Sequence, residues 1–144
     1  MYTLQTSDCF DSAHFLKGYE GKCSNIHGHR WKVEVTVAAA SLEEKGSTRG
    51  MVVDFKTLKD DLSELCDYFD HSLIIEKGSL KETTLKALLS EDFRIVEMDF
   101  RPTAENFAKY VYEEMTDKGY QVVLSKVYET PKNCAGYAPD YGEE

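Results

Sequence analysis

Residues 23–37, with the sequence CSNIHGHRWKVEVTV, carry the strongest signals for both the fold and the candidate site. From residue 29 onward, apolar residues alternate with polar ones, which is the pattern of a β-strand with one buried face. Trp31 and the valines that follow it belong to that face. His27 and His29 have the same parity, so both imidazoles are expected on the protected side of the sheet. Side chains at i and i+2 of a strand point the same way, and the pair can therefore reach one ion.

A histidine pair of this kind needs further ligands to form a metal site. His14, on the preceding predicted strand, offers a third imidazole. Neutral imidazole is a common ligand for zinc, and catalytic zinc usually has three protein ligands and one open position. Cys23, four residues before the pair, is a candidate nucleophile or base beside the ion. Two other interpretations remain open: Cys23 is the fourth ligand of a closed structural site, or it is an inert buried thiol.

The composition limits the classes of function. A chain of 144 residues is long enough for one domain, which we expect to span residues 1–144. The net charge of −9 and the lack of a basic stripe interleaved with aromatics argue against nucleic acid as a partner. The sequence has no apolar run of membrane-spanning length and no signal-peptide pattern, so we expect no membrane association and a cytoplasmic location. The four cysteines form no CxxC pair, which favours free thiols over a disulfide framework.

The remaining apolar patterns predict the strands of a small sheet. Loose or clear alternation is found in four segments: residues 2–16, 29–40, 121–130 and 134–138. Met51–Val53 follows a polar turn, and we expect it to be a further short strand that forms a hairpin with residues 29–40. A sheet this small leaves strand edges unpaired, and oligomerisation is a common way to cover them.

Two helices are predicted between these strands. The first begins after Asp54 as N-cap and ends near residue 69. Its apolar stripe repeats at three- and four-residue steps: Phe55, Leu58, Leu62, Leu65 and Phe69. The second begins after Thr103 as N-cap and ends near Lys118, and residues 76–92 are interpreted as an irregular insertion with a short helix. The predicted order is ββααββ, an α+β fold in which an antiparallel sheet carries the two helices on one face.

Asp70 and His71 directly follow the first predicted helix. A histidine there has a structural use, because its cationic form interacts favourably with the C-terminal end of the helix dipole. A catalytic use requires a carboxylate that orients the imidazole. Neighbours in an extended strand face opposite ways, so Asp70 orients His71 only if the chain turns at this point. Glu129, near a strand end, is either simply solvated or an acceptor for a guanidine-like group.

Five motifs together resemble the 6-pyruvoyl-tetrahydropterin synthase family. They are FDSAH at 10–14, CSNIHGH at 23–29, DH at 70–71, PTAEN at 102–106 and ETP at 129–131. The motifs occur in the family's order, span nearly the whole chain and include all four histidines. Within the family, the chain is more similar to the bacterial 6-carboxy-tetrahydropterin synthases of queuosine and 7-deazaguanine biosynthesis.

The resemblance implies a fold, an assembly and a reaction. The fold would be the tunnelling fold (T-fold), and the assembly a homo-hexamer of two stacked trimers. The substrate would be 7,8-dihydroneopterin triphosphate, and the products 6-carboxy-5,6,7,8-tetrahydropterin, acetaldehyde and triphosphate. Two alternatives remain: the related 6-pyruvoyl-tetrahydropterin synthase reaction, which eliminates triphosphate, and a non-catalytic structural zinc protein.

The resemblance also implies roles for individual residues. The zinc ligands would be His14, His27 and His29. Cys23 would be the base that removes a proton from the substrate side chain. Asp70 and His71 would relay protons and would reach the site from a neighbouring subunit.

The expected pterin-binding residues lie in the second half of the chain. Glu129 would anchor the pterin ring, with help from the turn that contains Thr103 and Glu105. The sequence departs from the family in two places. Residues 70–75 read DHSLII, without the Asn of the frequent Asp-His-x-x-Leu-Asn pattern, and the segment from 76 to 92 is longer than the usual connection. Neither departure touches the expected metal ligands.

Overall fold

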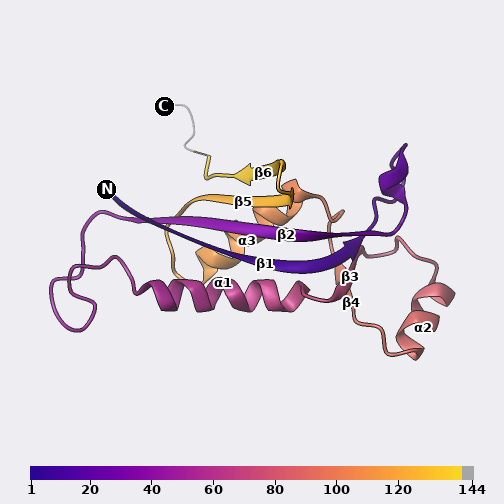
Figure 1. Cartoon of the computed structure of the whole chain (residues 1–144), viewed down its shortest axis with the longest axis horizontal. Helices are drawn as coiled ribbons and strands as arrows, with labels where there is room; N and C mark the ends of the chain where they lie inside the picture. The colour runs from indigo at the N-terminus through magenta and orange to yellow at the C-terminus, as the bar shows by residue number, and fades with distance from the viewer. Residues whose placement is uncertain (141–144) are drawn as a thin grey trace.

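In the computed structural model, which describes residues 1–140, a six-stranded sheet is combined with three α-helices (Figure 1). The elements follow one another as β1 (Tyr2–His14), β2 (His27–Ala39), α1 (Phe55–Phe69), β3 (Ser72–Glu76), α2 (Glu82–Ser90), β4 (Ile95–Met98), α3 (Ala104–Asp117), β5 (Val122–Thr130) and β6 (Asn133–Tyr137). The strand order across the sheet is β4-β3-β1-β2-β5-β6. The predicted single domain includes residues 141–144, which lie outside the described residues.

Strands β1 and β2 form one long antiparallel ribbon that carries the rest of the fold. The pairing runs without interruption from Tyr2 opposite Ala39 to His14 opposite His27. Side chains on one face of this ribbon are buried, and among them Trp31 has no exposed surface. The histidines of β2 share parity with Trp31, as predicted, because alternation along a strand keeps i, i+2 and i+4 on one face.

Helices α1 and α3 pack on the buried face of the ribbon. The side chain of Asp54 caps α1 by accepting a hydrogen bond from the Lys56 amide at 2.8 Å, and Thr103 caps α3 in the predicted position. A single core joins helices and sheet; its largest fully buried side chains include Trp31, Phe69, Phe107, Leu58 and Leu62. Phe55, predicted as part of the stripe of α1, is instead 65% exposed.

The predicted ββααββ order and fully antiparallel sheet are wrong between α1 and α3. Two further strands, β3 and β4, lie there, and β3 pairs in parallel with both β1 and β4. Ile74 and Ile75 are adjacent in β3 and both are almost completely buried. A strand buried on both faces does not alternate, so its periodicity gives no signal. The segment interpreted as an insertion contains α2 and forms the crossover that a parallel pair requires.

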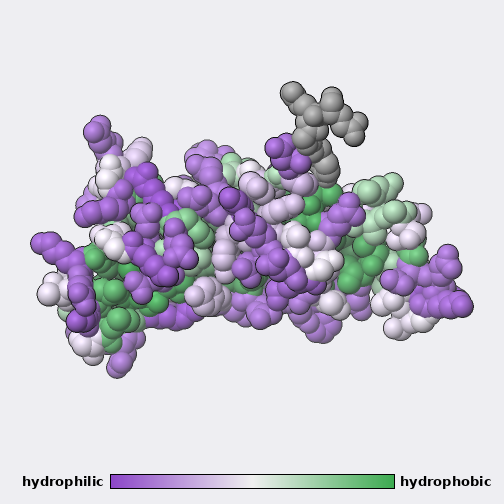
Figure 2. Space-filling view, turned by 180° about the vertical axis from the view of Figure 1, so that it is seen from behind, coloured by the Kyte–Doolittle hydropathy of each residue, from purple (hydrophilic) through white to green (hydrophobic). Residues whose placement is uncertain are grey.

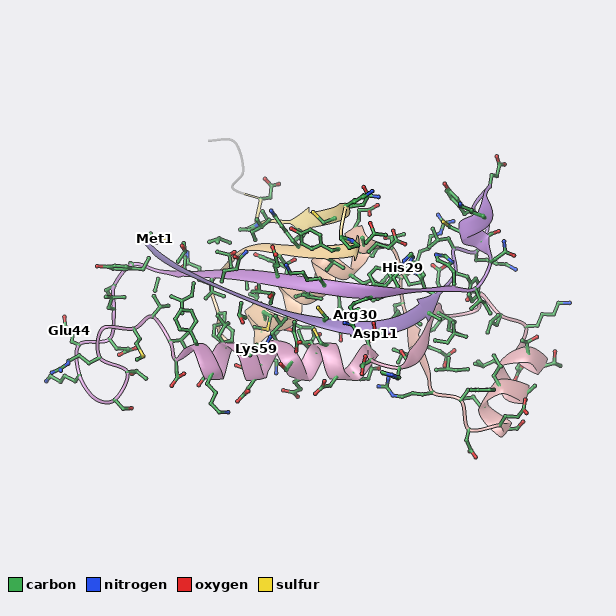
Figure 3. The ribbon with its side chains drawn as sticks, viewed as in Figure 1. Met1, Asp11, His29, Arg30, Glu44 and Lys59 are labelled. Carbon is green, nitrogen blue, oxygen red and sulfur yellow. The ribbon has the colours of Figure 1, made fainter. Side chains whose placement is uncertain are left out.

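The predicted short strand Met51–Val53 is also wrong. The Met51 carbonyl accepts a hydrogen bond from Glu43 at 2.9 Å, and the Gly50 amide donates to the Glu43 carbonyl at 2.8 Å. These bonds close the polar loop on itself instead of pairing the segment with β2. Glu44 of this loop lies with Met1 at one end of the molecule, and His29 lies toward the other end (Figure 3).

Exposed hydrophobic side chains gather at both ends of the molecule, including the end that carries α2 (Figure 2). The exposed side chains near that end include Ile26, Leu89 and Phe93. Among residues 1–140, no helix is both long enough and apolar enough to cross a membrane. All four cysteines are free thiols, as the sequence predicted.

Candidate metal centre and active site

Four side chains converge where β1 ends and β2 begins. Their ligand atoms all lie within 4.8 Å of one another, and they belong to His14, His27, His29 and Glu129. His14 is the last residue of β1, His27 the first of β2, and Glu129 lies at the end of β5. The fold thus brings the three predicted histidines together and adds a carboxylate that the sequence had suggested for another purpose.

The hydrogen bonds of two histidines fix their tautomers. Nδ1 of His14 lies 2.7 Å from the Pro102 carbonyl, and Nδ1 of His27 lies 2.7 Å from the Asn25 carbonyl. A carbonyl oxygen only accepts, so each Nδ1 carries the proton and each neutral ring presents a lone pair at Nε2. Those two Nε2 atoms lie 3.1 Å apart. Two acceptors facing each other at this distance are suited to binding a cation between them.

Glu129 and His29 complete the set of acceptors. Glu129 Oε1 lies 3.2 Å from Nε2 of His14 and 3.0 Å from Nε2 of His29. His29 Nε2 is buried, and within residues 1–140 its only polar contact is this one with Glu129, which lacks hydrogen-bond geometry. A buried polar atom without a partner is destabilising unless another group binds it. Three imidazoles and one carboxylate are ligand types that zinc and neighbouring transition metals accept, so the residues fit a metal ion.

Burial favours the neutral, metal-binding form of two of the three histidines. His14 is 1% exposed, and desolvation lowers the pKa of both His14 and His29 below the ordinary 6.5. The edge of the Trp31 ring system contributes to this burial, with centroids 4.9 Å from His14 and 5.5 Å from His29. Neutral imidazole is the form that coordinates metals, so the core that buries the rings also prepares them for an ion.

Cys23 lies in a single 3-10 turn, Lys22–Ser24, between β1 and β2. Its side chain is half-buried, and its carbonyl accepts a hydrogen bond from the Leu16 amide at 2.9 Å. Cys23 is not a member of the ligand cluster found within residues 1–140. The fourth group of that cluster is Glu129, whereas a closed structural site was expected to use Cys23.

A turn brings the side chains of Asp70 and His71 together, as their interaction was expected to require. His71 has a positive φ of 55°, and its Nδ1 lies 2.8 Å from Asp70 Oδ2. Asp11 of β1 holds both residues, because its amide donates to Asp70 Oδ1 at 2.8 Å and its carbonyl accepts from the His71 amide at 2.7 Å. The bond from the Asp11 amide, followed by His71, lowers the pKa of Asp70. The carboxylate therefore stays charged and orients the imidazole.

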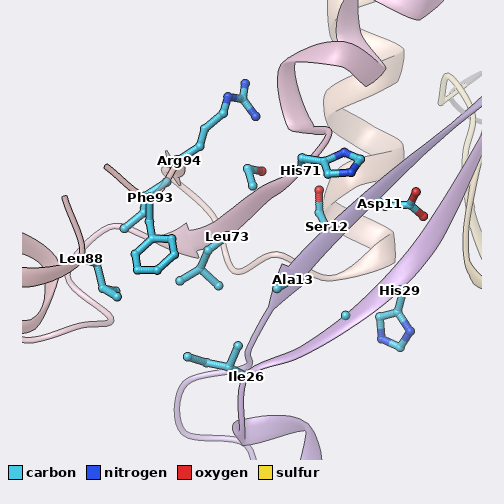
Figure 4. Close-up of a pocket in the computed structure, with 13 residues that line it drawn as sticks. Asp11, Ser12, Ala13, Ile26, His29, His71, Leu73, Leu88, Phe93 and Arg94 are labelled. Atoms are coloured by element: carbon cyan, nitrogen blue, oxygen red, sulfur yellow. The ribbon is translucent and has the colours of Figure 1, made fainter. Parts of the chain in front are cut away.

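Two cavities share His29 in their lining. One, of about 650 Å³, is bordered by His71 on one side and by Leu73, Leu88 and Phe93 on the other (Figure 4). The second, of about 570 Å³, is bordered by Lys32, Tyr128 and Glu129 among others. Within residues 1–140, no hydrogen bond or ion pair joins Asp70 or His71 to the ligand cluster, and the His71 side chain is 79% exposed.

The predicted pterin-binding turn has a clear structural role in this chain. Thr103 Oγ1 accepts a hydrogen bond from the Asn106 amide at 3.2 Å, and Glu105 is exposed in the first turn of α3. Sequence reasoning missed the Pro102 carbonyl as the partner of His14, since backbone acceptors leave no mark in a sequence. It also missed Glu129 as a neighbour of the histidines, although its shared parity with the buried Val127 was a usable signal.

Comparisons with known proteins identify the family of this chain. The family model described as 6-pyruvoyl tetrahydropterin synthase matches residues 3–140. A 6-carboxy-5,6,7,8-tetrahydropterin synthase of Haemophilus influenzae is 30% identical over 140 residues, which cover 95% of this chain and 99% of that protein. The protein of the same name from Rickettsia bellii is 37% identical over 131 residues, covering 87% and 91% of the two chains.

Solved structures show the same fold. The 6-pyruvoyl tetrahydropterin synthase of Caenorhabditis elegans matches with a TM-score of 0.67 and 25% identity over 96% of each chain. An uncharacterized protein of Wolinella succinogenes matches with a TM-score of 0.82 and 22% identity, covering 96% of this chain and 98% of that one. By sequence and by fold, this chain belongs to the 6-pyruvoyl tetrahydropterin synthase family.

Proposed function

We propose that this protein is a zinc-dependent carbon–carbon lyase that converts 7,8-dihydroneopterin triphosphate to 6-carboxy-5,6,7,8-tetrahydropterin, acetaldehyde and triphosphate. The observation that carries the proposal is the convergence of His14, His27, His29 and Glu129 next to two cavities. Relatives named for the 6-carboxy product, 30% and 37% identical, support the choice of reaction, which would belong to queuosine biosynthesis.

The proposed metal ligands are His14, His27 and His29. Zinc bound there would supply Lewis-acid chemistry, acidifying the hydroxyl groups of the substrate side chain. The Pro102 and Asn25 carbonyls keep the imidazole protons at Nδ1, so the rings present Nε2 toward the cluster without any rearrangement. Cys23, in the turn between the first two strands, is proposed as the base that takes a proton from the side chain.

The proposed proton relay consists of Asp70 and His71. A carboxylate that holds Nδ1 leaves Nε2 of His71 free to give or take a proton. Because His71 is exposed and makes no hydrogen bond or ion pair with the cluster of its own chain within residues 1–140, we propose that it serves the site of a neighbouring subunit in a homo-hexamer. The assembly and the cytoplasmic location stay predictions.

Substrate binding is proposed for Glu129, Thr103 and Glu105. The position of Glu129 supports its proposed role most directly. Its carboxylate contacts the histidines and also borders the second cavity. A carboxylate there can accept hydrogen bonds from a guanidine-like edge of a pterin. Lys32 and Tyr128 border the same cavity.

A second candidate function is the 6-pyruvoyl-tetrahydropterin synthase reaction. It is favoured by the description of the matching family model and by the structural match to the nematode enzyme. It would use the same ligands and the same base, so the two reactions differ in product rather than in visible geometry. The structural-zinc alternative is less well supported, because Glu129 rather than Cys23 completes the cluster.

Incubation of the zinc-loaded protein with 7,8-dihydroneopterin triphosphate tests the proposal. Mass spectrometry should find carboxypterin, and a coupled assay should find acetaldehyde in equal amount. The matched controls are metal-stripped protein and the Cys134→Ala variant, whose thiol is exposed on β6. A product that keeps its three-carbon side chain would establish the second candidate. Absence of turnover by fully loaded oligomer would refute both enzymatic functions.

A further inference from the structure

Arg101 contacts the loop that carries Cys23, although the two residues are far apart in the sequence. Its Nη2 donates a hydrogen bond to the Lys17 carbonyl at 3.1 Å, and its guanidinium carbon lies 5.9 Å from the centre of the Tyr19 ring. The Nε atom of Arg101 is buried and has no hydrogen-bond partner among residues 1–140. The interaction therefore depends on one hydrogen bond and one cation–π contact.

Tyr19 transmits this contact to the turn before Cys23. A Cβ atom placed on Gly21 would lie 2.7 Å from Cε1 of Tyr19, so the ring lies directly against the backbone of Gly21. Gly21 is the N-cap of the 3-10 turn that contains Cys23. The other side of the loop is closed by the hydrogen bond between the Leu16 amide and the Cys23 carbonyl. Removing Arg101 would thus free Tyr19, and with it one side of the turn.

The backbone of Arg101 is itself firmly held. Its carbonyl accepts hydrogen bonds from Asn106 Nδ2 at 2.9 Å and from the Thr103 amide at 2.8 Å, which tie it to the first turn of α3. The next carbonyl in the chain, that of Pro102, accepts from Nδ1 of the buried His14. The segment that grips the Cys23 loop is therefore the same segment that orients a member of the ligand cluster.

We propose that Arg101 is a positioning residue that clamps the Cys23 loop at a fixed place relative to His14. The inference rests on the proposed function only in its consequence for turnover, where Cys23 acts as the base. The clamp concerns only the position of the Cys23 loop. The accessibility of Cys23 to a thiol reagent reports that position without any assay of activity.

The test compares the alkylation rate of Cys23 by iodoacetamide in four proteins, all lacking the exposed Cys9 and Cys134 thiols through Ser substitutions. They are the parent, Arg101→Met, Arg101→Lys and the control Arg49→Met. Arg49 is exposed in the loop at the opposite end of the molecule, so its variant removes one positive charge without touching the site. Peptide mapping by mass spectrometry separates Cys23 from the buried Cys66.

We expect Arg101→Met to raise the alkylation rate of Cys23 several-fold and Arg49→Met to leave it unchanged. Arg101→Lys should give an intermediate rate, because lysine keeps the charge near the Tyr19 ring but loses the planar fork of arginine. Metal content should be unchanged, and kcat should fall by roughly tenfold to a hundredfold with little change in KM, as for a displaced catalytic group. Gly21→Ala, which displaces Tyr19 from the other side, should reproduce the faster alkylation and replaces Arg101→Met if that variant does not fold.

The outcomes separate the clamp from the proposed function. An alkylation rate that is unchanged or lower in both Arg101→Met and Gly21→Ala overturns the clamp, whatever the activity. Faster alkylation with undiminished kcat supports the clamp and shows that Cys23 is not the base. Faster alkylation with reduced kcat supports both.

Discussion

His14 and His27 hold their Nε2 atoms 3.1 Å apart while both Nδ1 protons are donated to backbone carbonyls. Neither ring can carry its proton at Nε2, where it would face the other ring, without giving up the hydrogen bond from Nδ1 to the carbonyl of Pro102 or Asn25. The contact is therefore one of two acceptors, and a cation between them relieves their repulsion. This relationship makes the pair specific for an ion rather than for a hydrogen-bonded network.

The first prediction concerns the ligands. His27→Ala should lose the metal and the activity together, because Glu129, the other group of the cluster, already lies beside His14 and His29 and adds no new ligand in place of the missing imidazole. Elemental analysis of the purified variant measures the metal. His71→Ala is the matched control, since its imidazole is exposed and outside the cluster, and it should keep a full complement. Full zinc occupancy in His27→Ala would refute the assignment of the ligands.

The second prediction concerns pH. Burial lowers the pKa of His14 and His29 below 6.5 in the folded protein, whereas both would titrate near 6.5 in the unfolded chain. The unfolded state then binds more protons, so the stabilising effect is complete above pH 6.5 and is lost as the pH falls through the lowered values. Calorimetry of the metal-free protein should show Tm falling between about pH 7 and pH 5.

A variant assigns that pH dependence to a buried ring. His29→Gln should flatten part of the decrease in Tm. The paired carboxylates Asp11 and Asp70 do not interfere, because their lowered pKa values place their titration at still more acidic pH. A Tm that is constant or rises on acidification through this range would contradict the prediction.

The third prediction concerns Cys23. As a base outside the cluster, Cys23→Ala should keep its metal and still bind pterin, but its turnover should fall by roughly a hundred- to ten-thousand-fold. Cys66→Ala is not a suitable control, because that thiol is buried and its pKa is raised to about 12 by desolvation. Cys134→Ala, with an exposed thiol, should retain the full rate. Loss of zinc from Cys23→Ala would instead favour the closed structural site.

The fourth prediction concerns the shared pocket. Inactive Cys23→Ala chains and inactive His71→Ala chains, mixed under conditions that exchange subunits, should regain part of the activity. Some pockets would then receive an intact Cys23 from one chain and an intact His71 from another. A pocket built within one chain would regain nothing, since every chain carries a defect. A fully active monomer in sedimentation would defeat both the assembly and the shared pocket.

Local patterns predicted the elements whose two faces have different surroundings. Alternation identified β1 and β2, and the side chains of Asp54 and Thr103 cap their helices as expected because a cap is a contact within three residues. The double burial of β3 left no period to read. The short helix expected within residues 76–92 is α2, but it buries none of its own residues, so no apolar stripe indicated its bounds. Long-range pairing, such as β3 beside the end of β1, has no local signal at all.

The candidate site was predictable to the extent that it lies on one strand. His27 and His29 follow from the parity of β2, whereas the approach of His14 and Glu129 depends on how three strands are placed side by side. The role of the carbonyls of Pro102 and Asn25 was beyond prediction, because any residue type supplies a carbonyl. The turn that lets Asp70 reach His71 requires a positive φ at His71, a conformation that is uncommon even for histidine, one of the residue types enriched in it.

The uninterrupted register of β1 and β2 has a consequence for how the chain reaches a single structure. A slip of one residue in this ribbon would turn every side chain of the slipped strand to the opposite face. Trp31 would leave the core, and His27 and His29 would leave His14 in the same step. The chain can therefore hold an ion at this cluster only when thirteen residue pairs are correctly matched, the most distant of them at the far end of the molecule. A metal ion at this cluster would therefore stabilise the correctly aligned ribbon over its slipped alternatives, because only the former would bind it.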